Sequence, residues 1–333
     1  MSRPVHVVGA GGIGVALAWC LMRDGRAVTM VDSNQGKVRD GERHGLTVQG
    51  RGALFPRFEH FRDWSPPANA LVLLCTKTYD NPEVLARLHA DAMLVPVQNG
   101  FDLQLEERAH AGEGIASFVS ECERDRPVTR ITRPGELHLG ARRTMTDDEQ
   151  AQLAALAQSL RKGALFQVAL VNDVRPFKAT KLMYNAAISP LAAAAGVDNG
   201  ELLTDPLAKR LFFGFLQENY AILRHARMPL ARIGPFHPRT VSRILCTPAL
   251  PALLAMFFRP SLRGTYCSMA PDITTGRTEV AAYNGHLIHL AEQFPCPFNR
   301  AACTMIHQIV THQQPPSREH LCDFALALPE SVR

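Results

Sequence analysis

The sequence predicts an α/β protein, with a doubly wound parallel sheet in its first half and only helices in its second half. Runs rich in β-branched residues alternate with helical or loop segments up to about residue 172, and long segments with helical periodicity follow. A chain of 333 residues is also too long for one ordinary core. We therefore expect two domains, at residues 1–172 and 173–333.

The first predicted element is a strand at residues 4–8, followed by a glycine-rich turn and a helix. The turn reads GAGGIG, which is the GxGxxG pattern in the context of strand, turn and helix. Gly9 allows a tight turn, Gly11 lets a pyrophosphate approach the backbone, and Gly14 lets the helix pack closely on the strand. The free N–H groups of the helix start attract phosphates. This predicts a Rossmann-type dinucleotide-binding domain, with these cofactor-binding residues: Gly9, Ala10, Gly11, Gly12, Ile13 and Gly14.

The choice between NADH and NADPH depends on Asp32, which ends the second predicted strand. An acid at this place usually accepts hydrogen bonds from the ribose 2′-hydroxyl and repels a 2′-phosphate, and so favours NADH. Asp32 could instead be a plain turn residue. Three basic residues follow closely and could offset the repulsion: Lys37, Arg39 and Arg43. The sequence thus predicts NAD(P)H as cofactor, with a preference for NADH that rests on Asp32.

Three further strand-like runs, at residues 70–77, 91–100 and 114–119, are expected to extend the parallel sheet. Ligands bind beyond the carboxyl ends of such strands. Lys77 and Asn99 fall at two of these ends, so both are candidate cofactor-side residues, although either could be a mere turn residue.

The remaining elements are one hairpin and a series of helices. The alternating pattern at residues 128–141 surrounds Pro-Gly and predicts a hairpin that completes the first domain. Helices are expected at residues 176–195, 204–227, 240–258, 277–294 and 298–312.

The helix expected at residues 176–195 carries Lys181, Asn185 and Ser189 on an otherwise apolar surface. At about 100° per residue, these three positions fall within an arc of roughly 80°. A lysine without a partner there would be costly, so it must face water, a carboxylate or a ligand. The plain alternative is a solvent-facing stripe on a half-buried helix. A second polar segment contains Glu279, which could be a first-turn carboxylate favoured by the helix dipole.

The composition argues against several classes of function. The net charge of +5, from 36 basic and 31 acidic residues, is spread along the chain without a basic run that would predict nucleic-acid binding. The eight cysteines show no CxxC pair and the 13 histidines no HExxH motif, so no metal site is expected. No signal peptide opens the chain, and the apolar run at 248–258 is too short to cross a bilayer. We expect a cytoplasmic protein without a membrane partner.

Several short motifs, in this order, resemble the ketopantoate reductase (2-dehydropantoate 2-reductase) family over nearly the full length. They are GAGGIG at 9, TK at 76, QNG at 98, KLMYN at 181, NGEL at 199, SMAPD at 268 and TEVAAYNG at 278. The family transfers hydride from NAD(P)H, usually NADPH, to ketopantoate in pantothenate biosynthesis. The resemblance therefore implies a small-molecule keto-acid substrate, and a homodimer is the ordinary assembly of such enzymes.

The resemblance also implies roles for individual residues. Lys181 looks like the lysine that protonates the keto oxygen, and Glu279 looks like the acid that holds the substrate hydroxyl. Lys77 resembles a residue beside the nicotinamide, and Asn99 resembles one beside both nicotinamide and substrate. The substrate-binding positions implied in this way are Asn99, Asn185, Ser189, Asn199 and Ser268.

Three features depart from the family pattern. Ser189 stands where a second asparagine is usual, Ala281 stands where an aspartate is usual, and the segment between Asp272 and Glu279 is one residue short. These departures favour a second hypothesis, a reductase of a different 2-keto or 2-hydroxy acid. A third hypothesis is a non-catalytic NAD(P)-sensing protein. The retention of both Lys181 and Glu279 argues against it, because a sensor needs no proton donor.

Overall fold

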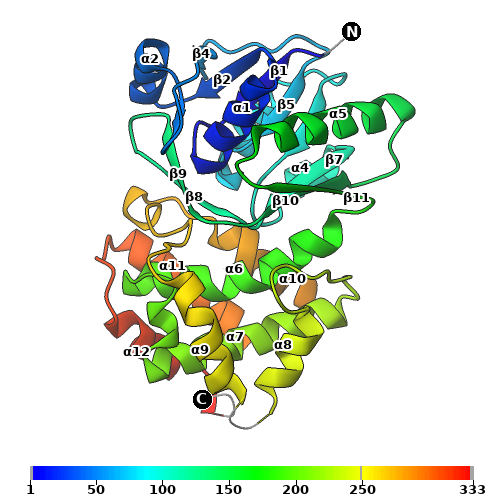
Figure 1. Ribbon diagram of the computed structural model, residues 1–333. Helices are drawn as coiled ribbons and strands as arrows, with labels where there is room; N and C mark the ends of the chain where they lie inside the picture. Colours follow the sequence, from blue (N-terminus) through cyan, green and yellow to red (C-terminus); the bar gives the residue numbers. More distant parts are fainter. Residues whose placement is uncertain (1–2, 248–249, 331–333) are drawn as a thin grey trace. The chain divides into compact units, whose positions relative to one another are not determined.

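The computed structural model describes residues 3–247 and 250–330. The chain divides into two compact units, Met1–Val174 (the first unit) and Arg175–Arg333 (the second unit). In the described part of the chain, every strand belongs to the first unit, and the second unit is built from helices and loops (Figure 1).

The first unit has a central sheet of five parallel strands, in the order β4-β2-β1-β5-β6. This confirms the predicted fold class. The elements of the unit are β1 (Val5–Val8), α1 (Gly12–Arg23), β2 (Val28–Asp32), α2 (Gln35–His44), β3 (Thr47–Val48), β4 (Arg57–His60), β5 (Leu71–Leu74), η1 (Thr78–Asp80), α3 (Asn81–Leu85), β6 (Met93–Pro96), α4 (Leu103–Glu107), β7 (Gly112–Ala116), β8 (Val119–Cys122), β9 (Val128–Arg133), β10 (Glu136–Ala141), α5 (Asp147–Gly163) and β11 (Gln167–Val171).

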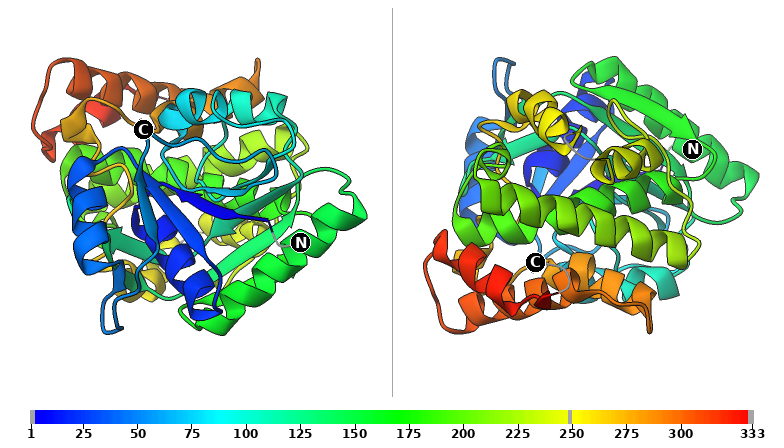
Figure 2. Two further views of the ribbon diagram at one scale, coloured as in Figure 1. Left: turned by 90° about the horizontal axis from the view of Figure 1, so that it is seen from above. Right: turned by 90° about the horizontal axis from the view of Figure 1, so that it is seen from below.

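The core of the first unit lies on both faces of this sheet. Strands β1, β5 and β6 are buried at every residue and are almost wholly apolar, as expected for parallel strands covered on both sides, with His6 of β1 as the exception. Helices α1 and α5 lie side by side (Figure 1; Figure 2, left). A Cβ atom at Gly163 of α5 would come within 2.5 Å of Cys20 in α1. The two helices can therefore pack this closely only because residue 163 is a glycine.

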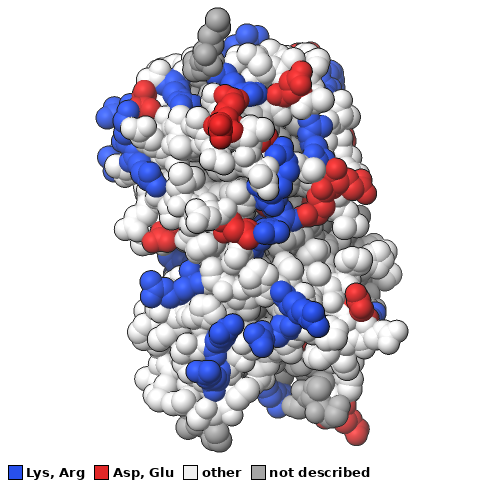
Figure 3. All heavy atoms as spheres, turned by 90° about the vertical axis from the view of Figure 1, so that its right-hand side faces the viewer, with Lys and Arg blue, Asp and Glu red and all other residues white. Residues whose placement is uncertain are grey.

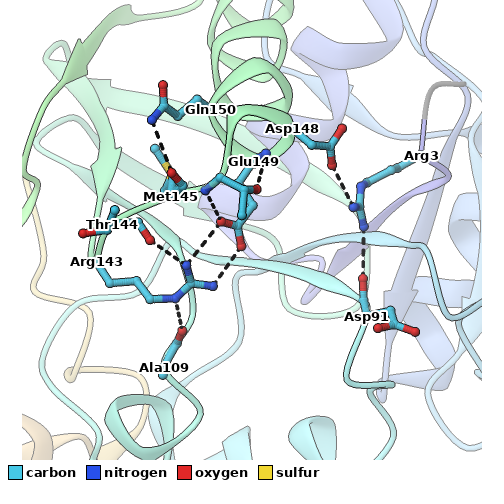
Figure 4. Close-up of polar contacts among 10 residues, drawn as sticks. Arg3, Asp91, Ala109, Arg143, Thr144, Met145, Asp148, Glu149 and Gln150 are labelled. Atoms are coloured by element: carbon cyan, nitrogen blue, oxygen red, sulfur yellow. Dashed lines mark hydrogen bonds and ion pairs between the residues drawn. The ribbon is translucent and has the colours of Figure 1, made fainter.

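Helix α5 was not predicted, although its start carries a recognisable signal. Thr146 and Glu149 form a capping box, in which each side chain accepts a hydrogen bond from the backbone N–H of the other residue. Arg143 donates to both carboxylate oxygens of Glu149 at 2.8 and 3.2 Å, and Arg3 donates to Asp148 at 3.0 Å (Figure 4). Acidic side chains at a helix start are favoured by the dipole, and here basic residues also hold them in place.

The predicted hairpin at residues 128–141 is wrong. Strand β9 pairs antiparallel with β8, and β10 pairs antiparallel with β7, so the hairpin turn lies between β8 and β9. Gly135, which was expected in the hairpin turn, packs against the residues that connect β7 to β8. A Cβ atom on Gly135 would lie 2.5 Å from the Phe118 backbone nitrogen. The alternating pattern identified two strands but not their partners. For the same reason, residues 114–119 do not extend the five-stranded parallel sheet.

The second unit begins with the long helix that carries the polar stripe. Its elements are α6 (Arg175–Ala195), η2 (Glu201–Leu203), α7 (Pro206–His225), α8 (Pro238–Leu245), α9 (Leu250–Leu262), η3 (Ile273–Thr275), the π-helical turn η4 (Ala281–Gly285), α10 (His286–Ala291), α11 (Pro297–Thr311) and α12 (Glu319–Ala327). The single helix predicted at 240–258 is therefore two helices, and its residues 248 and 249 lie outside the described residues. The helix predicted at 277–294 contains a π turn.

Aromatic residues form the centre of the second unit. Phe215 of α7 packs against Phe298 of α11 and Phe324 of α12, with ring centroids 5.2 and 5.4 Å apart. The view from below shows α7 running beside these two helices (Figure 2, right). These contacts hold α7 firmly against the C-terminal helices.

The surface of the described residues shows both signs of charge. On the face drawn in Figure 3, Lys and Arg side chains are interspersed with Asp and Glu side chains. Within the described ranges, no helix is both long enough and apolar enough to cross a membrane.

The pH dependence of stability should involve His6, which is buried in β1. The Nδ1 atom of His6 accepts a hydrogen bond from the Trp64 indole at 3.1 Å, which requires a neutral ring. Burial lowers the pKa of His6 below its usual value, and the charge of Arg57 lowers that pKa further. As the pH falls, the His6 ring of the unfolded chain therefore binds a proton at a higher pH than the His6 ring of the folded chain does.

We expect the free energy of unfolding to fall as the pH decreases through about 6.5, the ordinary histidine pKa, because protons bind preferentially to the unfolded state there. His6→Gln should make this dependence shallower. Denaturant unfolding at several pH values, followed by tryptophan fluorescence, measures it, since Trp19 and Trp64 both lie in the first unit. The exposed His89 provides the control variant His89→Gln. If the free energy of unfolding of His6→Gln changed with pH as steeply as that of the wild type, His6 would not be the source of the pH dependence.

Candidate functional site

The glycine turn after β1 combines three closely packed glycines, Gly9, Gly12 and Gly14, with one open position, Gly11. Gly9 has φ of +102°, and a Cβ atom there would lie 2.8 Å from the Cys75 backbone. A Cβ atom at Gly14 would overlap the Gly9 carbonyl oxygen. At Gly11, by contrast, a Cβ atom would meet nothing within 4 Å, and no side chain caps the start of α1. This open space beside uncapped N–H groups fits the pyrophosphate of a dinucleotide.

Asp32 is bonded directly to this glycine turn. Its carboxylate accepts the Ala10 N–H at 2.6 Å and the Asn34 N–H at 2.8 Å. Lys37 donates to the Ala10 carbonyl oxygen at 2.8 Å, so both polar groups of the Ala10 residue are held by side chains. A carboxylate has further lone pairs, and Asp32 can also accept from a ribose hydroxyl. Asp32 is therefore more than an ordinary turn residue, and Lys37 places a positive charge beside it.

The loops after β5 and β6, which carry the half-buried Lys77 and Asn99, are joined by two buried amides. The Gln98 amide donates to the Thr76 carbonyl oxygen at 2.7 Å and to the Asn81 side-chain oxygen at 2.8 Å. Asn81 donates back to Gln98 at 3.2 Å. These two amides were not predicted as site residues. The QNG motif that includes Gln98 was the only signal for them in the sequence.

Helix α6 presents one partly accessible stripe in an otherwise buried surface. Lys181, Tyr184, Asn185 and Ile188 are half-buried, whereas their neighbours on the helix are buried. Ser189 is only 3% exposed and lies off this stripe. The predicted line of three polar residues is therefore partly accessible at Lys181 and Asn185, and buried at Ser189.

A proline inside α6 removes one helix hydrogen bond, and a side chain replaces it. Pro190 has no N–H to offer the Ala186 carbonyl group, one turn earlier. The side-chain amide of Asn284, in the π turn η4, donates to the Ala186 oxygen at 2.9 Å. Asn284 is fully buried. This bond fastens the segment that follows Glu279 directly to the helix that carries Lys181.

The same amide group belongs to a buried network of asparagines. Asn284 also donates to Asn299 at 2.9 Å, Asn299 donates to Asn219 at 2.8 Å, and Asn219 donates to the Met183 carbonyl oxygen at 2.9 Å. Glu218 accepts two backbone N–H groups at the start of α11, and burial raises the pKa of this carboxyl group. The network thus connects α6, through the buried Met183 and Ala186, with α7, η4 and α11.

Glu279 and Ser268 are brought together by a residue that was not predicted. The Tyr283 hydroxyl donates to a carboxylate oxygen of Glu279 at 3.0 Å and lies 3.3 Å from the Ser268 hydroxyl. Burial and the neighbouring Glu279 charge raise the pKa of Tyr283 well above its usual value, so this phenol stays protonated. The spacing of four residues between Glu279 and Tyr283 was the only signal in the sequence.

Asn199 lies in the turn after α6 and is bound to the segment before Ser268. Its backbone N–H donates to the Thr265 carbonyl oxygen at 2.9 Å, and its amide donates to the Thr265 hydroxyl at 3.2 Å. Asn199 is 7% exposed, and its side-chain oxygen has no hydrogen-bond partner among the described residues. Ala281, by contrast, is exposed, so the missing family aspartate would have stood at an exposed position.

The described residues offer neither a metal site nor a disulfide. No group of three or more His, Cys, Asp or Glu side chains could hold a metal ion there. All eight cysteines carry free thiols. Burial raises the pKa of Cys303 to about 11 and that of Cys20 to about 12, which keeps both thiols protonated.

Comparison with known proteins gives matches in both units. The family model described as ketopantoate reductase PanE/ApbA matches residues 5–143, and the model of its C-terminal part matches residues 173–310. A 2-dehydropantoate 2-reductase of Aquifex aeolicus is 24% identical over 304 residues, which cover 86% of this chain and 90% of that protein.

Solved structures share the fold at lower identity. A D-mandelate dehydrogenase with NADH and anilino(oxo)acetate is 17% identical, with a TM-score of 0.75, and the match covers 94% of this chain and all of that one. A PanE/ApbA family ketopantoate reductase from Ralstonia eutropha is 21% identical, with a TM-score of 0.72, and the match again covers 94% and 100%.

Gly11 offers a direct test of the dinucleotide site. Gly11→Val should fold normally, because a side chain there meets open space and φ is an ordinary −84°. The valine would occupy the expected place of the pyrophosphate, so binding of NAD(H) and NADP(H) should both weaken by at least about tenfold, as judged by nicotinamide fluorescence. Gly52→Val, at another open position, is the matched control. Undiminished affinity in folded Gly11→Val would show that GAGGIG is only a structural turn.

Proposed function

The chain belongs to the ketopantoate reductase family of NAD(P)-dependent oxidoreductases acting on CH–OH groups, and we propose that it reduces a 2-keto acid to the corresponding 2-hydroxy acid. Ketopantoate is the first substrate to test. The connection between Lys181 and Glu279 supports the proposal most. Lys181 is half-buried and lies on the accessible stripe of α6, and Glu279 is buried in a segment that Asn284 binds to the same helix. A proton donor and a carboxylate are thus carried by segments that are bonded to each other.

The chemistry follows from these residues. Bound NAD(P)H supplies a hydride to the keto carbon. Lys181 donates its proton to the keto oxygen as negative charge develops there, which is general-acid catalysis of the kind typically worth about 10²–10⁴ in rate. Glu279 accepts a hydrogen bond from the substrate hydroxyl, and Asn185, on the same stripe as Lys181, offers an amide to the substrate. The carbonyl group gains one hydride and one proton and becomes a secondary alcohol.

A second candidate function is the reduction of a different 2-keto acid, and two observations favour testing it. Ser189 carries a hydroxyl where the family usually has a second asparagine, so one amide contact to the substrate is missing. The similar D-mandelate dehydrogenase was solved with an aromatic oxo-acid. NAD(P)H oxidation with ketopantoate, phenylglyoxylate and aliphatic 2-keto acids decides between them. Nucleotide binding without turnover of any 2-keto acid would instead favour the sensing protein.

Cofactor preference is proposed to follow Asp32, with a higher kcat/KM for NADH than for NADPH. Asp32→Asn removes the negative charge that repels a 2′-phosphate and keeps one oxygen to accept a backbone N–H. The ratio of kcat/KM for NADPH to that for NADH should therefore rise in this variant by about tenfold, as expected for one charge. A wild-type enzyme with strong preference for NADPH would show that Lys37 outweighs Asp32.

Lys181 should act in the transition state more than in substrate binding. Lys181→Ala is expected to lower kcat by about 10²-fold or more, while cofactor affinity barely changes. Lys181→Arg should restore little, because a guanidinium group stays protonated and is a poor proton donor. Steady-state kinetics on the best keto acid measures both variants. Normal turnover in both would leave Lys181 as a solvated helix lysine and remove it from the mechanism.

A further inference from the structure

Tyr283 stands between two residues that the family resemblance assigns to the substrate. Its hydroxyl donates to Glu279 at 3.0 Å, so its oxygen can accept the proton of the Ser268 hydroxyl, 3.3 Å away. The Tyr283 side chain is fully buried, and Glu279 is only 3% exposed. The contacts therefore form a directed chain from Ser268 through Tyr283 to Glu279.

We propose that Tyr283 is a positioning residue that fixes the orientation of the Glu279 carboxylate toward the side-chain hydroxyl of the substrate. This inference rests on the proposed function, in which Glu279 binds that hydroxyl. Tyr283 touches neither the reacting carbon nor the keto oxygen in this scheme, and it acts through Glu279 alone.

The physical basis is the strength and direction of a hydrogen bond to a buried charged acceptor. Hydrogen bonds to a charged acceptor are stronger than neutral ones, and in a buried site they are little weakened by water. A carboxylate with one oxygen held cannot rotate about its last bond without breaking that contact. Tyr283 also comes from the same turn as Glu279, and the Asn284 bond to α6 holds that turn in place.

The test compares two substrates that differ only in the hydroxyl group. Ketopantoate carries it, and 3,3-dimethyl-2-oxobutanoate has the same skeleton without it. Tyr283→Phe removes one oxygen atom and keeps the ring. We expect kcat/KM for ketopantoate to fall about tenfold or more, chiefly through KM, and kcat/KM for the analogue to change less than about twofold. The preference for the hydroxylated substrate should therefore fall about tenfold.

Two further variants make the result specific. Tyr220→Phe removes a phenol from α7 of the same unit and should leave the preference unchanged. Glu279→Gln keeps Tyr283 and should lower the preference at least as far as Tyr283→Phe does. Combining Tyr283→Phe with Glu279→Gln should lower it no further, because Tyr283 acts through the carboxylate. The Glu279→Gln variant tests the role of Glu279, on which the proposal depends, so an unchanged preference there would overturn the proposal even if Tyr283→Phe does not fold.

The outcomes separate this inference from the proposed function. Equal losses for both substrates in Tyr283→Phe, or wild-type kinetics, would overturn the positioning role while wild-type turnover still supported keto-acid reduction. If the wild type reduces both compounds equally well, the assigned role of Glu279 is wrong and this inference fails with it. If the wild type reduces neither compound nor any other 2-keto acid, the proposed function itself fails.

Discussion

The arrangement of the second unit depends on the hydrogen bond from the Asn284 side chain to the Ala186 carbonyl oxygen. A proline in the helix interior leaves the carbonyl group one turn earlier without its usual partner, and a buried carbonyl group without a partner is costly. Asn284 satisfies it and continues the hydrogen bonding to Asn299. The Asn284 amide belongs to the turn that follows Glu279. Its hydrogen bond to Ala186 therefore also holds the segment of Glu279 against α6, the helix that carries Lys181.

The first unit holds its predicted cofactor loops in a comparable way. These loops lie beyond the ends of the strands, where the sheet no longer pairs the backbone groups, so side chains must bind them. Asp32 and Lys37 bind the two polar groups of Ala10, and Gln98 binds the carbonyl group of Thr76. Asp32, the residue proposed to contact the ribose, therefore also supports the glycine turn. A substitution that removes both carboxylate oxygens of Asp32 would therefore also remove the hydrogen bonds that hold the glycine turn.

The sequence was sufficient for the fold class, because local patterns of strands and helices carry it. It was insufficient wherever the partner is distant. The pattern at residues 128–141 showed two strands, but their partners β7 and β8 lie earlier in the chain, and the predicted hairpin was wrong. Tyr283 was missed because a buried tyrosine on a helix reads as ordinary core. Only the folded structure shows that its hydroxyl reaches Glu279 and Ser268.

The π turn η4 explains how one short segment performs two tasks. In an α-helix, Tyr283 would lie about 40° around the axis from Glu279, but Asn284 would lie about 140° from it. A π turn, with hydrogen bonds that span five residues, holds more residues per turn and brings position i+5 closer to the face of position i. Glu279 precedes this turn and keeps α-helical spacing to Tyr283, whose N–H donates to the Glu279 carbonyl oxygen at 3.1 Å. The π turn begins at Ala281 and contains Asn284, which reaches α6. Such turns occur often at functional sites, and here the π turn places the anchoring Asn284 directly after the α-helical spacing that joins Tyr283 to Glu279.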